Sequence, residues 1–188
     1  MTYNPEIHHR KSIRLKEFDY SQAGYYFVTI CSHNREHLFG KVNVGKMELN
    51  EKGNLAIKIL LDLPNRFNSI EIDSYIIMPN HLHTIIIINQ PEYESRTVGV
   101  ELALPQKESL PVKVIQDRAS SVPTLGRIIQ VFKSISTIEI NRYRTVSGIP
   151  IWQRNYFEHV IRNEKELYEI RKYIEYNPLN WMDDEYNK

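Results

Sequence analysis

In the stretch MPNHLHTIIII, residues 78–88, two alternating histidines follow a proline and an asparagine and lead into four isoleucines. Isoleucine favours β-structure, so residues 81–88 are predicted to form a strand whose later half is anchored in the core. Alternate side chains of a strand share a face, which places His81 and His83 side by side, roughly 7 Å apart at Cα. Such a pair is half of a metal site, although one core histidine and one exposed histidine would give the same pattern.

Further strands are predicted on both sides of this stretch. Residues 70–78 pair with it through a tight Pro-Asn corner, and residues 24–32 (GYYFVTICS) are rich in aromatic and β-branched side chains. Residues 37–44 are expected to form a hairpin or an extended loop, and residues 151–161 the last strand.

Three helices are predicted from apolar residues at helical spacing, each behind a capping residue. They are residues 51–63 after Asn50, closed by Pro64, residues 125–143 after Thr124, and residues 164–176 after Asn163, ending near Pro178. The order strand, helix, strand, strand, helix, strand predicts an α+β, ferredoxin-like split βαβ fold, with an antiparallel sheet and both crossover helices on one face. The C-terminal helix is then expected to cover the other face, against the two histidines.

Length and composition predict one compact domain over residues 1–188, because 41% of the residues are hydrophobic. Residues 1–20 are expected to form a basic arm, and residues 89–123, interrupted by prolines, an insertion or mobile loop in which only residues 98–104 could pair weakly. Cys31 is the only cysteine, which excludes an internal disulfide and a thiolate zinc site. Without a membrane-length apolar run or a signal-peptide pattern, a cytoplasmic protein is expected.

The formal net charge of +1 argues neither for nor against a nucleic-acid partner, but the basic residues are unevenly placed. They gather in the N-terminal arm and in the second half of the chain. Those that could follow a phosphate backbone include Arg10, Lys11, Arg14, Lys133, Arg154 and Arg162. A solvated helix surface would explain the same charges.

The C-terminal helix offers a nucleophile. On its helical wheel Tyr173 and Asn177 lie together at one edge of the apolar stripe made by Leu167, Ile170 and Ile174. The phenol would then lie close to the histidine pair, and Asn177 could offer its amide oxygen as a third metal ligand. Ordinary packing for Tyr173 and a helix C-cap for Asn177 are the alternatives.

This set of groups predicts phosphoryl-transfer chemistry. Two neutral imidazoles and a carbonyl oxygen leave open positions on a divalent ion, which suits Mg²⁺ or Mn²⁺ engaged with phosphate. The Tyr173 oxygen would attack phosphorus in line, giving a phosphotyrosine and a free hydroxyl end. A phenol with a pKa of about 10 needs the metal, a water or a base to take its proton.

Six stretches resemble REP-associated tyrosine transposases, the single-tyrosine branch of the HUH superfamily, in which two histidines flank a hydrophobic residue. They are residues 10–35 (RKSIRLKEFDYSQAGYYFVTICSHNR), 38–40 (LFG), 78–83 (MPNHLH), 125–134 (LGRIIQVFKS), 151–162 (IWQRNYFEHVIR) and 173–178 (YIEYNP). Only residues 89–123 fall outside the likeness.

The resemblance implies cutting and joining of single-stranded DNA, often beside a hairpin of repetitive palindromic sequence, through a 5′-phosphotyrosine and a free 3′-OH. By position it implies that His81, His83 and Asn177 bind the metal and that Tyr173 is the nucleophile, on a catalytic helix of residues 163–177. The positions that it would bring to DNA include Trp152, Gln153 and Arg154, together with Lys133 and Arg162, with core packing as the alternative for Trp152. A monomer or homodimer acting on single-stranded or hairpin DNA, away from membranes, is expected.

Two other functions remain open from the residues alone. A non-catalytic nucleic-acid-binding module of the same fold would stack bases on exposed sheet aromatics such as Tyr25, Phe27 or Tyr75. A metal-dependent phosphodiesterase would use water as its nucleophile and leave Tyr173 as a structural residue.

Overall fold

The structure, a computed structural model, describes residues 19–90 and 122–187. Its centre is a four-stranded antiparallel sheet with the strand order β4-β5-β1-β6. These strands are β1 (Gly24–Cys31), β4 (Ile70–Met78), β5 (His81–Ile88) and β6 (Phe157–Ile161). The predicted hairpin of β4 and β5 and the ferredoxin-like split βαβ fold are therefore confirmed.

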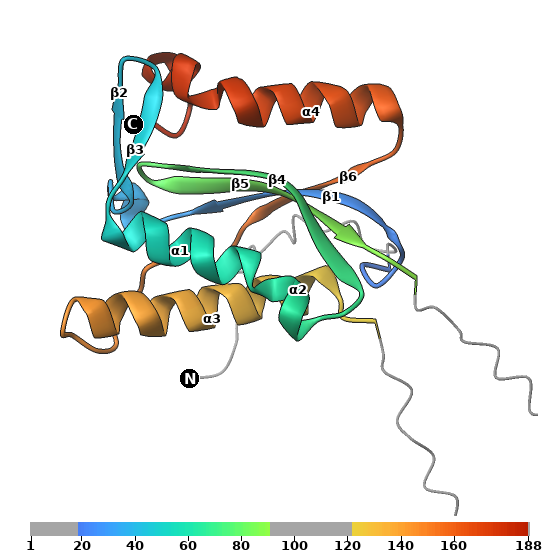
Figure 1. The fold of residues 1–188 in the computed structure, drawn as a ribbon, viewed down its shortest axis with the longest axis horizontal. Helices are drawn as coiled ribbons and strands as arrows, with labels where there is room; N and C mark the ends of the chain where they lie inside the picture. The colour runs from blue at the N-terminus through green and yellow to red at the C-terminus, as the bar shows by residue number, and fades with distance from the viewer. Residues whose placement is uncertain (1–18, 91–121, 188) are drawn as a thin grey trace, which may run out of the picture.

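The helices lie on both faces of the sheet. Figure 1 shows α1 (Glu51–Leu61), α2 (Leu63–Arg66) and α3 (Leu125–Tyr143) on one face and α4 (Glu164–Tyr176) on the other. The three predicted N-caps are confirmed, because the side chains of Asn50, Thr124 and Asn163 each accept a hydrogen bond from a backbone amide in the first helical turn. The two remaining helical segments are the short 3₁₀ helices η1 (His33–Arg35) and η2 (Asn177–Asp183).

The two faces of the sheet carry separate hydrophobic cores. The larger core joins the sheet to α1 and α3, through side chains such as Val28 on β1 and Leu82 on β5. The smaller core lies under α4 and consists of Phe27, Ile85, Ile161, Leu167 and Ile174. Alternation along β1 and β5 sends neighbouring side chains to opposite cores, which leaves His81 and His83 on the α4 face together with Ile85.

Part of residues 37–44 belongs to a hairpin, one of the two forms that the sequence predicts for them. The strand β2 (Gly40–Asn43) pairs with β3 (Lys46–Leu49) in a separate two-stranded sheet. Val44 and Gly45 turn the chain between them with φ of 48° and 69°, and two positive φ values are what a two-residue hairpin turn of this kind requires.

Two other boundaries differ from the prediction. The last strand begins at Phe157, and the earlier residue Trp152 makes only an isolated bridge to Ser32. The helix α1 ends at Leu61, two residues before the predicted end. Pro64 lies in the first turn of the next helix, α2, where its missing backbone N–H costs nothing.

Residues 1–18 and 91–121 lie outside the described part of the chain. The predictions for the basic arm and for the insertion with its weak pairing at residues 98–104 therefore fall almost wholly outside it. Within residues 19–90 and 122–187, no helix has the length and apolar character needed to cross a membrane.

Candidate active site at the histidine pair

The two histidines lie at the start of β5, an interior strand paired with β1 on one side and with β4 on the other. His81 is 0% exposed and His83 is 1% exposed. Their Nε2 atoms face each other at 3.0 Å. The predicted side-by-side arrangement is therefore present, on a strand that is held by backbone hydrogen bonds along both edges.

Asn80 fixes which nitrogen of His81 carries a proton. The side-chain Nδ2 of Asn80 donates to the backbone carbonyl oxygens of Tyr186 at 2.7 Å and of Arg35 at 3.3 Å. Its Oδ1 is therefore the atom that faces Nδ1 of His81, at 2.9 Å. An amide oxygen only accepts, so Nδ1 of His81 is the protonated nitrogen and Nε2 presents a lone pair.

Thr29 allows His83 two tautomers. Because Nε2 of His81 presents a lone pair, Nε2 of His83 donates a proton to it, unless a cation lies between the two nitrogens. The Thr29 hydroxyl, 2.8 Å from Nδ1 of His83, donates in the first case and accepts in the second. Two nitrogens bound at right angles to one ion at about 2.1 Å are about 3 Å apart, so the observed spacing fits a shared ion.

Both imidazoles are held in their neutral form. Burial, and to a lesser extent the guanidinium of Arg35, lowers the pKa of His81 to about 3. Burial, followed by the influence of His81, lowers the pKa of His83 well below its ordinary value. Metal ligation requires the neutral form of histidine, so neither ring has to lose a proton before it binds a cation at neutral pH.

Tyr173 lies where the helical wheel predicts it. Its hydroxyl oxygen is 3.3 Å from Nε2 of His83, and 43% of the residue is exposed to solvent. Burial of the hydroxyl region raises the pKa of this phenol, and the carboxylates of Asp184 and Glu185 raise it further. The phenol is therefore protonated at neutral pH and open to a ligand on its solvent side.

Asn177 follows α4 directly and caps its last turn through its backbone N–H. The residue is 2% exposed, and its Oδ1 is buried without a hydrogen-bond partner among the described residues. A buried carbonyl oxygen without a partner costs free energy, whereas a bound cation would satisfy it. The donor set of two neutral imidazoles and one amide oxygen thus fits a divalent ion. In the described part of the chain, no group of three or more His, Cys, Asp or Glu side chains is placed to hold one.

The C-terminal residues after α4 cover the histidine pair, a feature that the sequence reasoning missed. The Tyr186 ring lies 4.7 Å from the His81 ring and 5.9 Å from the His83 ring, measured between centroids. Asn80 holds the Tyr186 carbonyl, and Nη1 of Arg35 donates to the Glu185 carbonyl at 3.2 Å. The only sequence feature that could have predicted this cover is the presence of aromatic residues in the charged C-terminal segment. The near-zero exposure of the histidines means that a phosphate must displace this segment to reach them.

The predicted DNA-contacting residues have different surroundings. Arg10, Lys11 and Arg14 lie outside the described residues, whereas Arg154 and Arg162 are exposed. Lys133 donates to the backbone carbonyls of residues 153, 154 and 155, at 2.9, 3.3 and 3.0 Å, and so ties down the segment that carries Arg154. Trp152 is a core residue, because its ring stacks on Phe39 at 4.8 Å and its Nε1 donates to Ser136.

Of the aromatic residues that a base-stacking module would use, Phe27 is poorly placed for that purpose, whereas Tyr75 on β4 is 36% exposed. Phe27 is 8% exposed and belongs to the core under α4. Its ring meets those of Tyr173 and Phe157 edge-on, at 6.1 and 6.4 Å. Because α4 covers this face of the sheet, it is not an open stacking surface for bases (Figure 1).

Comparisons with known proteins agree with this architecture. The structure of a REP-associated tyrosine transposase bound to a REP hairpin matches with a TM-score of 0.50 at 18% sequence identity, covering 89% of this chain and 73% of that one. The two proteins therefore share a fold. A Haemophilus influenzae protein described as uncharacterized is 39% identical over 183 residues, which are 97% of this chain and 96% of that protein. The chain belongs to the same family as this protein, and no family profile matches it.

Proposed function

We propose that the protein is a metal-dependent single-stranded DNA endonuclease and strand transferase of the transposase type. The observation that carries the proposal is the contact between the Tyr173 hydroxyl and Nε2 of His83, one member of a buried, neutral histidine pair. A phenol, two uncharged imidazoles and a buried amide oxygen are the groups that such a reaction needs, and the contact of Tyr173 with His83 in one chain supports this role.

The metal site would consist of His81, His83 and Asn177. These residues would hold Mg²⁺ or Mn²⁺, and the ion would supply Lewis-acid chemistry at the scissile phosphate. Asn80 holds the tautomer that leaves Nε2 of His81 free for ligation, and Thr29 accepts from Nδ1 of His83 in the tautomer that leaves the other Nε2 free. Outer partners of this kind keep ligands oriented before the substrate arrives.

Tyr173 would act as the nucleophile. Its oxygen attacks phosphorus in line, the bond from phosphorus to the 3′-oxygen breaks, and the products are a 5′-phosphotyrosine and a free 3′-OH. The raised pKa keeps the phenol protonated, so its proton would pass to water as the bond to phosphorus forms, and the leaving 3′-oxygen would take a proton from water. Because the phosphodiester energy is retained in the phosphotyrosine, a second 3′-OH can attack it and rejoin the strand.

The substrate would be single-stranded or hairpin DNA, related to a repetitive palindrome. The similar structure contains a REP hairpin bound to its transposase, which supports this substrate class. Exposed basic residues such as Arg154 and Arg162 are available to the phosphate backbone. A monomer would suffice for cleavage, since tyrosine and histidines meet within one chain, and a homodimer remains compatible with it.

The test is incubation with Mn²⁺ and a labelled DNA hairpin that has single-stranded flanks. The proposal expects a protein–DNA adduct that survives denaturation, and loss of both adduct and cleavage in Tyr173→Phe. Tyr168→Phe is the matched control, because Tyr168 is 57% exposed on the same helix and contacts Lys172 instead of the histidines.

The alternatives give different results. Cleavage that persists in Tyr173→Phe without an adduct would identify a phosphodiesterase that uses water. Binding without Mn²⁺-dependent cleavage, across a panel of hairpins, would identify a non-catalytic binding module.

A further inference from the structure

The helix α4 needs more than its apolar core to place Tyr173. Leu167 and Ile174 bury their side chains against the sheet, but such contacts are non-directional and allow a helix to slide or rotate by small amounts. A displacement of about 1 Å can cost about 100-fold in rate when a nucleophile must meet its target in line. Directional polar contacts of α4 are therefore needed to fix its position.

One polar contact joins the middle of α4 to β4, an edge strand of the sheet. Nε of Arg171 donates to Oδ2 of Asp73 at 2.9 Å, and Nη2 of Arg171 donates to Oδ1, which makes a two-pronged ion pair. The register of β4 shifts between Ile72 and Ser74, so Asp73 occupies a bulge. A bulge changes the direction of a side chain, and this bulge directs the Asp73 carboxylate toward α4. The carboxylate meets the helix at Arg171, two residues before Tyr173.

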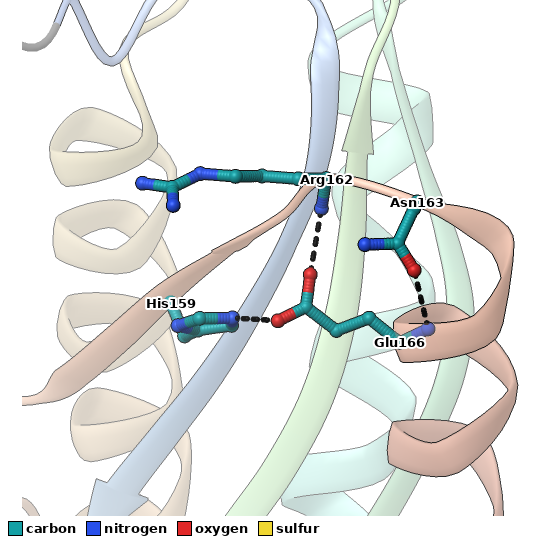
Figure 2. Close-up of polar contacts among 4 residues, drawn as sticks. All are labelled: His159, Arg162, Asn163 and Glu166. Carbon is teal, nitrogen blue, oxygen red and sulfur yellow. Dashed lines mark hydrogen bonds and ion pairs between the residues drawn. The ribbon is translucent and has the colours of Figure 1, made fainter.

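A second polar contact joins the first turn of α4 to β6, the opposite edge strand. Figure 2 shows the carboxylate of Glu166 between the ring of His159 and the backbone nitrogen of Arg162. Oε1 lies 2.6 Å from Nε2 of His159, and Oε2 accepts from the Arg162 nitrogen at 2.8 Å. The backbone nitrogen of Glu166 in turn donates to the capping Asn163 at 2.9 Å. The side chain of Glu166 thus joins the start of α4 to the edge strand β6.

The two contacts together fix the helix across the sheet. They lie on β4 and β6, the two outer strands, while the target of Tyr173 lies on the interior strand β5. We propose that Asp73 and Glu166 are positioning residues, whose contacts with Arg171 and His159 hold α4 where the Tyr173 hydroxyl meets His83 of the same chain. The importance of this for catalysis rests on the proposed function, but the placement itself does not.

The first test needs neither DNA nor metal. The imidazole NMR signals of His83 report on Tyr173, because its ring lies 5.1 Å away, and Tyr173→Leu identifies the shift that loss of this contact produces. Asp73→Asn and Glu166→Gln are expected to move the His83 signals in the same direction. Asp62→Asn is the matched control, because it removes an exposed ion pair with Arg66 at α2, on the other face of the sheet. Asn and Gln keep the shape of the side chains that they replace, so all three variants should fold, which circular dichroism checks.

The second test uses Mn²⁺ and hairpin DNA. At saturating DNA, Asp73→Asn is expected to slow adduct formation about 10-fold while the Kd for DNA changes less than about 2-fold. The double variant Asp73→Lys/Arg171→Glu exchanges the two charges and so restores an attraction between α4 and β4. It should form the adduct faster than either single variant, which a general loss of structure would not produce.

Unchanged His83 signals in Asp73→Asn and Glu166→Gln would overturn the proposal, as would equal adduct rates in Asp73→Asn and the wild type. If the wild-type protein forms no adduct, the proposed function fails, and the His83 signals still decide whether these residues position the helix.

Discussion

The hydroxyl oxygen of Tyr173 lies 3.3 Å from Nε2 of His83, although 90 positions separate the two residues in the chain. The contact joins the last helix to an interior strand of the sheet, and it links the two residues on which the proposed chemistry depends. Around it, Asn80 and Thr29 hold the histidines, Asn177 offers a buried oxygen, and Tyr186 covers the rings.

The buried histidines predict a pH-dependent stability. Because the pKa of His81 falls from 6.5 to about 3 on folding, the unfolded chain binds more protons in this interval. The free energy of unfolding should therefore be highest above pH 6.5 and decrease as the pH falls, by up to about 1.4 kcal/mol per pH unit for each histidine. Urea denaturation at pH 7.5, 6.5 and 5.5 measures the slope.

His37→Gln is the comparison variant, because it removes an exposed histidine instead of a buried one. His81→Gln should make the slope shallower. A stability that is constant from pH 7.5 to 5.5 would contradict the neutral, buried state of the pair.

Thr29 and Thr84 make a matched pair of buried threonines. The Thr29 hydroxyl contacts Nδ1 of His83, whereas the Thr84 hydroxyl finds no partner among the described residues. Thr29→Val should weaken Mn²⁺ binding about 10-fold, because the tautomer that frees Nε2 loses its acceptor. Thr84→Val should leave Mn²⁺ binding unchanged. Calorimetric titration with Mn²⁺ distinguishes the two, and an equal effect of both substitutions would count against the role of Thr29.

The covering ring of Tyr186 predicts that its removal opens the site. Tyr186→Ala keeps the backbone carbonyl that Asn80 holds, so it tests the ring alone. Modification of His81 by diethylpyrocarbonate, followed by peptide mass spectrometry, should become several-fold faster, and adduct formation with DNA should increase. Tyr176→Ala, an exposed tyrosine at the end of α4, is the control. If His81 reacts at the wild-type rate in Tyr186→Ala, the ring is not the barrier.

Exposed arginines predict the salt dependence of DNA binding. A residue that neutralises one phosphate adds about one to the slope of log K against log salt concentration. Arg154→Ala and Arg162→Ala should each reduce this slope by about 1, whereas Arg142→Ala should not, because Arg142 pairs with Glu139 near the end of α3. Fluorescence anisotropy over a range of KCl concentrations measures the slopes. Identical slopes in all three variants would mean that the DNA backbone does not contact Arg154 and Arg162.

Periodic patterns in the sequence predicted most of the fold. Alternation placed His81 and His83 on one face, and the helical wheel selected Tyr173 and Asn177 from a helix with three tyrosines. These inferences depend only on local geometry, because a strand repeats every two residues and a helix every 3.6. The capping residues Asn50, Thr124 and Asn163 were predicted for the same reason.

The features that the sequence did not predict depend on contacts between distant segments. The bulge at Asp73 orients its carboxylate usefully only because Arg171 lies opposite it, and Tyr186 lies over His81 with its backbone carbonyl bound by the distant Asn80. Trp152 matched a DNA-binding pattern, but its neighbour Phe39 comes from a segment more than a hundred residues earlier.

The histidine ligands belong to a strand with hydrogen-bonded neighbours on both sides, whereas the tyrosine and the aromatic cover belong to segments attached through a few side chains. Substitutions in the attached segments can therefore change access and timing while the ligands keep their geometry. A lineage could alter how readily such a protein cuts its target without rebuilding the centre that does the cutting.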